Sequence, residues 1–398
     1  MQSVRHILSE IRLKGDVAVR QFTQKFDGAL LEDFRVPEAA FEVAESKVDA
    51  ELKEAIALAA KRVRAFYEHQ PKEGFIHQEN GSLLGQLVRP LERVACYVPG
   101  GQVPLFSTLL MTAVPAQVAG VPDIVVATPA NAKGEVAPEI LLAAKYIGLS
   151  TIYRLGAAVA VGALAFGTAS IKRVDKIVGP GNAYTMAAKK LAFGEVGIEA
   201  LPGPTETLVI ADDSADLNHV IADLLAQAEH DAAQPVLVTT SQSLAQAVET
   251  GLEASIRALP NPAMALESCM ERGYLVVVDS LDEAIEVANA YAAEHLCLLV
   301  QDPWKLVPQV KHAGGLFIGE NSMEALGDYI IGPSHVMPTS GTARFSSAIN
   351  VRDFQKVIPL ISLNKETVTA IGPAGAKMAR AEGLEAHARA IESRLKGD

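Results

Sequence analysis

Histidine side chains stand close to carboxylate or amide side chains at four points of this chain. In chain order the groupings are Gln227 with His230, Glu294 with His295, Asp328 with His335, and Glu382 with His387. Imidazole and carboxylate are the groups that both divalent metal binding and proton transfer require. The pattern therefore predicts metal-assisted acid–base chemistry before any fold is considered.

Gln227 and His230 lie three residues apart at the end of an apolar stripe of helical period that begins at Leu217. Residues at this spacing project from one side of a helix, so the two side chains can hold one metal ion. Glutamine is a weak, neutral oxygen ligand, however, and a polar helix end is the alternative interpretation.

Glu294 and His295 stand where an expected helix meets an expected strand. Adjacent side chains of an extended segment point to opposite faces, so the pair can address two sides of a pocket as an acid and a base. A charge pair that merely ends a helix is the alternative.

Asp328 and His335 flank a loop that contains glycine and proline, and such loops commonly position functional groups. Asp328 offers a hard oxygen ligand, with a turn-stabilising aspartate as the alternative. Glu382 and His387 are separated by about 140° on an α-helix and have Gly383 between them, so they would not share one face. A solvated, charged tail is the alternative there.

The composition is that of an aliphatic α/β protein. Hydrophobic residues make up 49% of the 398 residues and aromatic residues only 5%, which suits buried parallel strands. The formal net charge of −12 argues against nucleic-acid binding, and no GxGxxG, Walker, HExxH or GxSxG motif is present. Three cysteines without a CxxC pair, and first residues without an apolar signal core, lead us to expect a cytoplasmic protein. The most apolar window, residues 109–130, contains three prolines and is expected to be a helix, a turn and a strand.

Short aliphatic strands alternate with helices over most of the chain. Residues 1 to about 70 have helical patterns, and the chain turns polar and helical again from about Phe354. Strands are expected at 85–90, 93–98, 123–129, 151–155 and 176–178, and then at 208–210, 236–238, 273–278, 295–300 and 316–318. This rhythm predicts an α/β fold of two similar, incomplete Rossmann-like wound units, with a helical N-terminal segment and a helical C-terminal tail. Ligands of such sheets bind at the carboxyl ends of the strands, where residues 99–101 and 179–182 fall.

Motifs along nearly the whole chain resemble those of the histidinol dehydrogenase family. They are, in order, Tyr97-Val98-Pro99-Gly100-Gly101, Pro104-Leu105-Phe106-Ser107-Thr108, Ala163-Leu164-Ala165-Phe166-Gly167-Thr168, Val174-Asp175-Lys176-Ile177-Val178-Gly179-Pro180-Gly181-Asn182, Gln227-Ala228-Glu229-His230, Glu294-His295-Leu296 and Gly341-Thr342-Ala343-Arg344-Phe345-Ser346-Ser347. The resemblance implies an enzyme that uses NAD and one Zn²⁺ per subunit to oxidise L-histidinol through the aldehyde to L-histidine.

The resemblance also implies roles for individual residues. The zinc ligands would be Gln227, His230, Asp328 and His387, and the catalytic pair would be Glu294 and His295. Substrate would be bound by Thr205, Gln227, His230, His295, Asp328, His335, Glu382 and His387, and the cofactor by Tyr97, Asn182 and Val159. Residues 1–96 with 206–350 would form one domain and 97–205 the NAD-side domain. The tail, 351–398, would reach the neighbouring subunit of a domain-swapped homodimer.

Three positions depart from the family's usual pattern. Val159 stands where glutamine is usual near the cofactor, Thr205 where serine is usual, and Cys297 where glutamate is usual. These departures keep open a second interpretation, a zinc- and NAD-dependent dehydrogenase of another small alcohol such as a sulfopropanediol. A non-catalytic ligand-binding relative is the third, and the presence of both Glu294 and His295 argues against it.

Overall fold

The chain folds into two compact units. The computed structural model describes residues 1–101 and 103–395. The larger unit comprises Met1–Gln70 and Leu91–Phe354, and the smaller one comprises Pro71–Pro90 and the chain from Gln355 onward. Two five-stranded sheets belong to the larger unit, and a three-stranded sheet belongs to the smaller.

The first sheet of the larger unit is parallel and has the strand order β5-β4-β3-β6-β7. Its strands are β3 (Arg93–Tyr97), β4 (Asp123–Thr128), β5 (Ile152–Arg154), β6 (Lys176–Val178) and β7 (Gly197–Ile198). From the central β3 the chain moves outward through β4 and β5, then crosses to the other side of β3 for β6 and β7. The strand order therefore reverses between β3 and β6, where an open parallel sheet leaves a crevice at its carboxyl edge.

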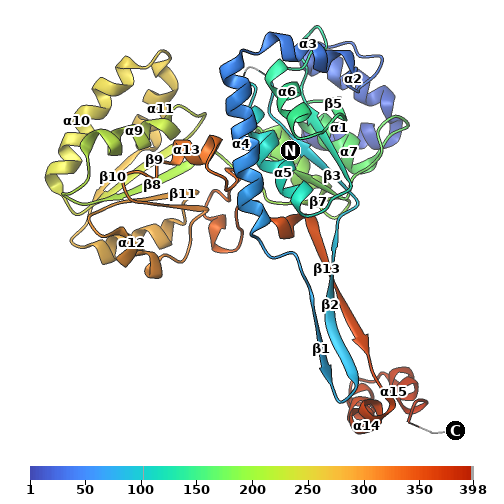
Figure 1. The fold of residues 1–398 in the computed structure, drawn as a ribbon. Helices are drawn as coiled ribbons and strands as arrows, with labels where there is room; N and C mark the ends of the chain where they lie inside the picture. The colour runs from blue at the N-terminus through green and yellow to red at the C-terminus, as the bar shows by residue number, and fades with distance from the viewer. Residues whose placement is uncertain (102, 396–398) are drawn as a thin grey trace. The chain divides into compact units, whose positions relative to one another are not determined.

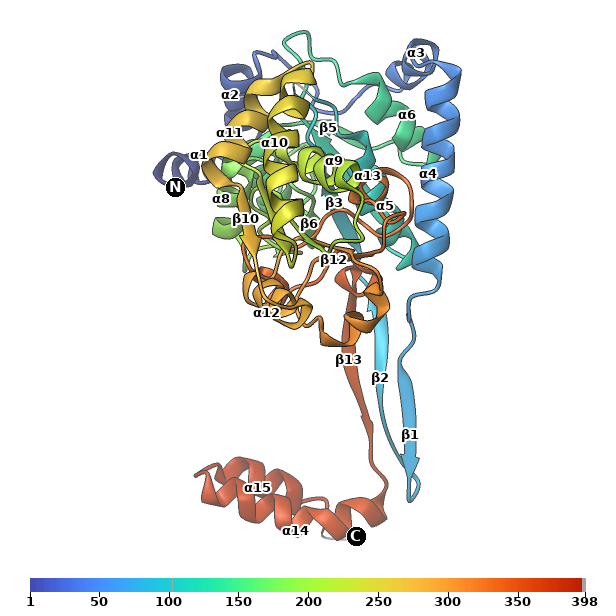
Figure 2. The ribbon, with the colours of Figure 1, turned by 90° about the vertical axis from the view of Figure 1, so that its left-hand side faces the viewer.

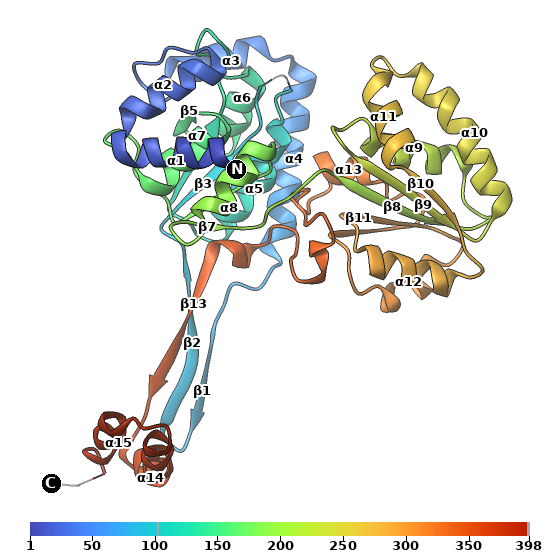
Figure 3. The same ribbon diagram turned by 180° about the vertical axis from the view of Figure 1, so that it is seen from behind.

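Helices cover both faces of this sheet (Figures 1 and 3). Alternate side chains of its strands pack with one helix layer or the other. Val94 and Cys96 pack with one layer, and Ala95 and Tyr97 pack with the other. The first layer consists of α3 (Ala39–Lys47), α4 (Ala50–Glu68), α5 (Phe106–Val118) and α6 (Pro138–Tyr146). The second consists of α1 (Gln2–Lys14), α2 (Asp16–Asp27), α7 (Ala157–Phe166) and α8 (Ala183–Ala192). We call this sheet with its helices the first lobe; it includes the N-terminal helical segment.

The second sheet repeats this plan with the strand order β10-β9-β8-β11-β12. Its strands are β8 (Glu206–Ala211), β9 (Gln234–Thr239), β10 (Tyr274–Val277), β11 (His295–Leu299) and β12 (Gly315–Ile318). One face packs on α9 (Leu217–Ala228) and α10 (Gln242–Ala258), and the other on α12 (Leu281–Tyr291). Two further helices, α11 (Pro262–Arg272) and α13 (Glu324–Tyr329), complete what we call the second lobe. Short 3₁₀ turns occupy Pro303–Lys305, Val307–Gln309, Thr342–Arg344 and Val351–Phe354.

The smaller unit is an antiparallel sheet followed by two helices (Figure 2). Strand β2 (Ser82–Pro90) pairs with β1 (Phe75–Glu79) and along its length with β13 (Gln355–Ser362), before α14 (Lys365–Ala381) and α15 (Glu385–Glu392). The expectation of a helical chain from Phe354 is therefore wrong for its first eight residues, which are strand. Residues 357–361 are an apolar run rich in strand-forming side chains, and pairing with β2, from a distant part of the chain, makes this segment a strand of the sheet.

The predicted fold class is confirmed: two wound α/β units of the same plan are present, with helices at both ends of the chain. The apolar window at 109–130 is the expected helix, turn and strand, formed by α5 and β4. None of the described helices is long and apolar enough to cross a membrane. Of the three cysteines, all free, Cys96 and Cys297 are buried and Cys269 is partly exposed.

Candidate active site

The candidate catalytic residues gather where β8 and β11 begin. These neighbouring parallel strands are in register, with His295 opposite Thr207, so the residues just before each strand lie side by side. Thr205 and Glu206 enter β8 while Glu294 and His295 enter β11. The cluster therefore occupies the amino ends of the second sheet, whereas wound sheets usually bind ligands at their carboxyl ends.

His295 is held in a defined orientation. Its ring is 2% exposed, and Nδ1 lies 3.1 Å from the carbonyl oxygen of Glu206. Because a carbonyl oxygen can only accept, Nδ1 carries a hydrogen, and Nε2 is the nitrogen that gains or loses a proton. Nε2 makes no hydrogen bond to any described residue, although Asp328 Oδ1 lies 3.7 Å away. Burial by itself lowers the pKa of His295, but the surrounding carboxyl groups, Glu294 foremost, outweigh it and raise the pKa.

Glu294 is also buried, at 7% exposure, and burial raises its pKa to about 7. Its Oε2 lies 2.6 Å from Thr205 Oγ1 and accepts a hydrogen bond from the Glu206 amide at 3.3 Å. Thr205 Oγ1 also lies 2.9 Å from Gln227 Oε1. A hydroxyl has one hydrogen to donate, so when Thr205 donates to Gln227, the proton between Thr205 and Glu294 must come from the carboxyl group. The raised pKa of Glu294 is consistent with that protonated form.

Gln227 connects this pair to Asp328. The Gln227 side chain projects from the last turn of α9 and is 2% exposed, and its Nε2 donates to Asp328 Oδ2 at 3.3 Å. This bond directs the amide nitrogen to Asp328 and the amide oxygen to Thr205. Burial would raise the pKa of Asp328, but the neighbouring His295 outweighs it and lowers the pKa.

His335 connects Asp328 to the first lobe. Its Nδ1 lies 2.7 Å from the backbone carbonyl of Asp328, and its Nε2 lies 3.1 Å from Thr108 Oγ1 on α5. Because the carbonyl must accept, Nδ1 donates and Nε2 accepts from the threonine. Both ring nitrogens are thus engaged, and burial lowers the pKa of His335.

The remaining metal candidates are less enclosed. Helix α9 ends at Ala228, so His230 lies in the turn beyond it and is exposed rather than standing on the helix as expected. Its backbone nitrogen donates to the Gln227 carbonyl at 3.0 Å, which keeps the two residues adjacent. Glu382 is the C-cap of α14 and His387 stands on α15, both exposed in the smaller unit. Among residues 1–101 and 103–395, no three His, Cys, Asp or Glu side chains gather into a metal-binding group.

The expected cofactor residues lie in the first lobe, at its strand-order reversal. Tyr97 ends β3, and its hydroxyl accepts from the Ala157 amide at 2.9 Å. Asn182 caps α8, with its side-chain oxygen accepting from the amides of Tyr184 and Thr185 at 3.0 and 3.1 Å. Val159, by contrast, stands on α7, is 3% exposed and packs into the core of the first lobe.

Comparison with known proteins identifies the family of this chain. The family model described as histidinol dehydrogenase matches residues 1–395. The chain belongs to the histidinol dehydrogenase family. The histidinol dehydrogenase of Deinococcus radiodurans is 58% identical over 99% of this chain and 91% of its own length, and that of Thermus thermophilus is 49% identical over 98% and 93%.

Solved structures agree with this assignment. The crystal structure of histidinol dehydrogenase from Elizabethkingia anophelis matches with a TM-score of 0.95 and 38% identity, covering 99% of this chain and 92% of that one. A probable aldehyde dehydrogenase from Listeria monocytogenes, at 12% identity and a TM-score of 0.52 over 92% of this chain and 98% of that one, shares the fold alone.

A buried carboxyl group outside the family motifs, that of Glu324, joins β8 to β11 just beyond Glu294 and His295. Glu324 is 0% exposed at the start of α13, one helical turn before Asp328. Its Oε2 accepts from Thr207 Oγ1 on β8 and from Cys297 Sγ on β11, the latter at 3.7 Å. Burial raises its pKa to about 8. The spacing of four residues to Asp328 on one helix was the available sequence signal.

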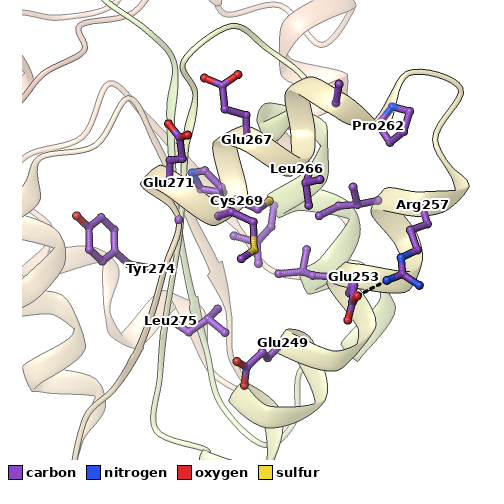
Figure 4. A pocket seen from close by; sticks show the side chains of 17 residues that line it. Glu249, Glu253, Arg257, Pro262, Leu266, Glu267, Cys269, Glu271, Tyr274 and Leu275 are labelled. Atoms are coloured by element: carbon purple, nitrogen blue, oxygen red, sulfur yellow. Dashed lines mark hydrogen bonds and ion pairs between the residues drawn. The ribbon is translucent and has the colours of Figure 1, made fainter.

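A large surface groove in the second lobe lies apart from this cluster (Figure 4). It has a volume of about 1160 Å³ between α10, α11 and β10 and is lined by apolar side chains such as Leu266 and Leu275, with Glu249 and Glu267 among its acidic residues. None of the family's expected site residues lines it. The volume of this groove therefore does not point to the residues that the family resemblance singles out.

Proposed function

We propose that this protein oxidises L-histidinol through L-histidinal to L-histidine, with two NAD and one zinc ion per site, in the last steps of histidine biosynthesis. The observation that carries the proposal is the buried Glu294–His295 pair, joined through Thr205 to Gln227 and Asp328. Membership of the histidinol dehydrogenase family supports the substrate.

Gln227, His230 and Asp328 would hold the zinc together with His387 of a second copy of the chain. An amide oxygen, a carboxylate and two imidazoles form a donor set that zinc accepts. The Gln227 side chain already lies beside Asp328, with its amide nitrogen 3.3 Å from Asp328 Oδ2 and its amide oxygen 2.9 Å from Thr205 Oγ1, and His230 follows Gln227 by one turn.

When bound, the zinc would act as a Lewis acid that orients the amine, imidazole and alcohol of the substrate. In its neutral form, His295 Nε2, which makes no hydrogen bond to the described residues, would accept the hydroxyl proton as hydride leaves the carbinol carbon for NAD. Glu294 in its ionised form then takes a proton from water as it adds to the aldehyde, and the aldehyde oxygen takes the proton that His295 had accepted, which gives the hydrate and returns His295 to its neutral form. Loss of a second hydride and a hydroxyl proton from the hydrate yields the carboxylic acid. His295 and Glu294 are adjacent in the chain but have different surroundings, so each can serve one of two successive proton transfers.

A domain-swapped homodimer is proposed from the character of the smaller unit. Its apolar side chains are unusually exposed, Ile361 at 70% and Met378 at 66%, with Phe75, Ile76 and Ile371 also above half. A surface of this kind is typical of a segment covered by another chain. Glu382 and His387 belong to the same smaller unit. The unit with the exposed apolar side chains therefore also carries His387, the proposed shared zinc ligand.

The departures from the family pattern are compatible with histidinol as the substrate. Thr205 keeps the hydroxyl that a serine would offer, and that hydroxyl contacts both Gln227 and Glu294. Val159 fills a core position, so its side chain stabilises the first lobe by packing. The activity on another small alcohol is therefore the competing outcome of the experiment below.

The direct test is NADH production by the zinc-loaded protein on L-histidinol and on a panel of small alcohols, sulfopropanediol included. We expect two NADH for each histidinol consumed. Turnover of another alcohol without turnover of histidinol would contradict the proposal.

Site sharing is tested separately by mixing subunits. A His295→Ala chain and a His387→Ala chain, each inactive alone, should regain activity after subunit exchange because one site of the mixed dimer has neither change. A mixture of His295→Ala with Glu294→Ala chains is the matched control, since both changes lie in the same unit. Recovery in the control alone, or in neither mixture after proven exchange, would count against the shared site.

A further inference from the structure

A fully buried ion pair lies beneath the carboxyl edge of the first sheet. Lys189, on α8, and Glu199, just after β7, have side chains that are 0% and 3% exposed. Lys189 Nζ donates to both carboxylate oxygens of Glu199 at 2.8 Å. A third bond runs from Nζ to the carbonyl oxygen of Gly179 at 3.0 Å, so all three hydrogens of the ammonium group are engaged.

Both backbone groups of Gly179 are bound by this pair. Glu199 Oε1 accepts from the Gly179 amide at 2.7 Å, and Lys189 binds the carbonyl. Gly179 has a φ of +118°, and a Cβ at this position would lie 2.1 Å from the carbonyl oxygen of Tyr97. The residue thus passes directly against the end of β3, and the ion pair fixes it there.

Gly179 begins the loop that enters α8 through Asn182. The loop leaves β6 at the strand-order reversal, beside the segment that leaves β3 after Tyr97. This is the crevice where a wound parallel sheet binds its ligand. Anything that fixes Gly179 therefore fixes one wall of that crevice.

Stability alone gives no reason for charged residues at this depth. Desolvating two charges costs about as much as their attraction returns, and apolar replacements of a buried pair are often neutral or stabilising. What an apolar pair cannot do is bind an amide and a carbonyl group. We propose that Lys189 and Glu199 are positioning residues for the dinucleotide cofactor, holding the loop 179–182 in its binding conformation through Gly179. This role rests on the proposed function, which places NAD at this edge.

The test separates loop positioning from folding. In the variant K189M/E199L the charges are removed together, so thermal stability should stay within about 3 °C of the wild type. The Gly179 amide and carbonyl lose their partners, and the dissociation constant for NAD, measured by calorimetry, should rise about tenfold. E199Q keeps an acceptor for the Gly179 amide, so its dissociation constant should rise by less.

The control residue lies on β6, the strand that the loop 179–182 follows. Lys176 begins β6, away from the loop, and its Nζ donates to the carbonyl oxygen of Asp353 at 2.6 Å. K176M removes a partly buried lysine but should leave NAD affinity unchanged.

The outcomes divide as follows. Wild-type NAD affinity in a folded K189M/E199L variant would overturn the positioning role and leave the proposed function standing. An equal loss of affinity in K176M would also overturn it, since the effect would then be unspecific. If the double variant does not fold, unchanged affinity in E199Q overturns the role and weakened affinity supports it. A wild-type chain that does not bind NAD would overturn the proposed function, and the role with it.

Discussion

Removal of the Thr205 hydroxyl should lower kcat/KM far more than removal of its methyl group. Thr205 Oγ1 lies 2.9 Å from Gln227 Oε1 and 2.6 Å from Glu294 Oε2, and both partner side chains are less than a tenth exposed. The variant T205V keeps the shape and removes the hydroxyl. It leaves a buried amide oxygen without a donor and a buried carboxyl group with only the Glu206 amide, at 3.3 Å.

Two hydrogen bonds at about 1–1.5 kcal/mol each give a loss of about 2–3 kcal/mol. If the bonds act in the transition state, kcat/KM for histidinol should fall about 30- to 150-fold. T205S, which keeps the hydroxyl, should stay within about threefold of the wild type. NAD affinity should be unchanged in both variants, because Tyr97 and Asn182 lie in the other lobe.

Steady-state kinetics with zinc-loaded protein, together with calorimetry of NAD binding, check this prediction. T112V is a suitable control, since Thr112 is a buried threonine whose hydroxyl donates to the Thr108 carbonyl within α5. A T205V enzyme within threefold of the wild type would refute the idea that this hydroxyl organises the site. So would an equal loss in T112V.

Three further predictions follow from other parts of the structure. Burial raises the pKa of Asp27 from 3.8 to about 6, so the folded protein loses stability as pH rises through this range and the carboxyl group ionises. D27N has no charge to bury, so it should match the wild type at pH 4 and be about 1 kcal/mol more stable at pH 8, after allowance for solvent screening of this half-buried group. Chemical denaturation at both pH values checks this. E324A should lower zinc affinity about 10- to 100-fold because it releases the helix that carries Asp328. E324Q is close in shape to the neutral acid and should bind zinc nearly as well as the wild type. Equal zinc affinity in the wild type and both variants, measured by competition with a chelator, would contradict this. Removal of zinc by a chelator should abolish activity and lower the melting temperature of the dimer, and added zinc should restore both; activity that survives with less than a tenth of a zinc per subunit would contradict the proposed cofactor.

Local sequence patterns determined the layers of this protein. Buried parallel strands have aliphatic runs and the helices have apolar stripes, so β6 was expected at its observed bounds and β4, β9 and β11 within two residues of theirs. The ends of the helices and strands were harder to predict. His230, expected on α9, lies beyond the end of that helix. The segment of β13, expected to be helical, is a strand, and its apolar run at 357–361 was the available sequence signal.

Motifs located the expected catalytic residues but not what holds them. Nothing local pairs Lys189 with Glu199, and nothing local indicates that Thr207 and Cys297 meet Glu324. These contacts join segments that the strand order brings together.

The sequence by itself determined the family and the alternation of strands and helices, and it named candidate side chains for metal binding and proton transfer. Only the tertiary structure decided that Nδ1 of His295 is hydrogen-bonded while Nε2 makes no hydrogen bond to the described residues, that His335 has both nitrogens engaged, and that Glu294 and Gln227 share one hydroxyl. The physical reason is that hydrogen bonding and burial set the protonation and orientation of a side chain, and both depend on neighbours that are distant in the chain.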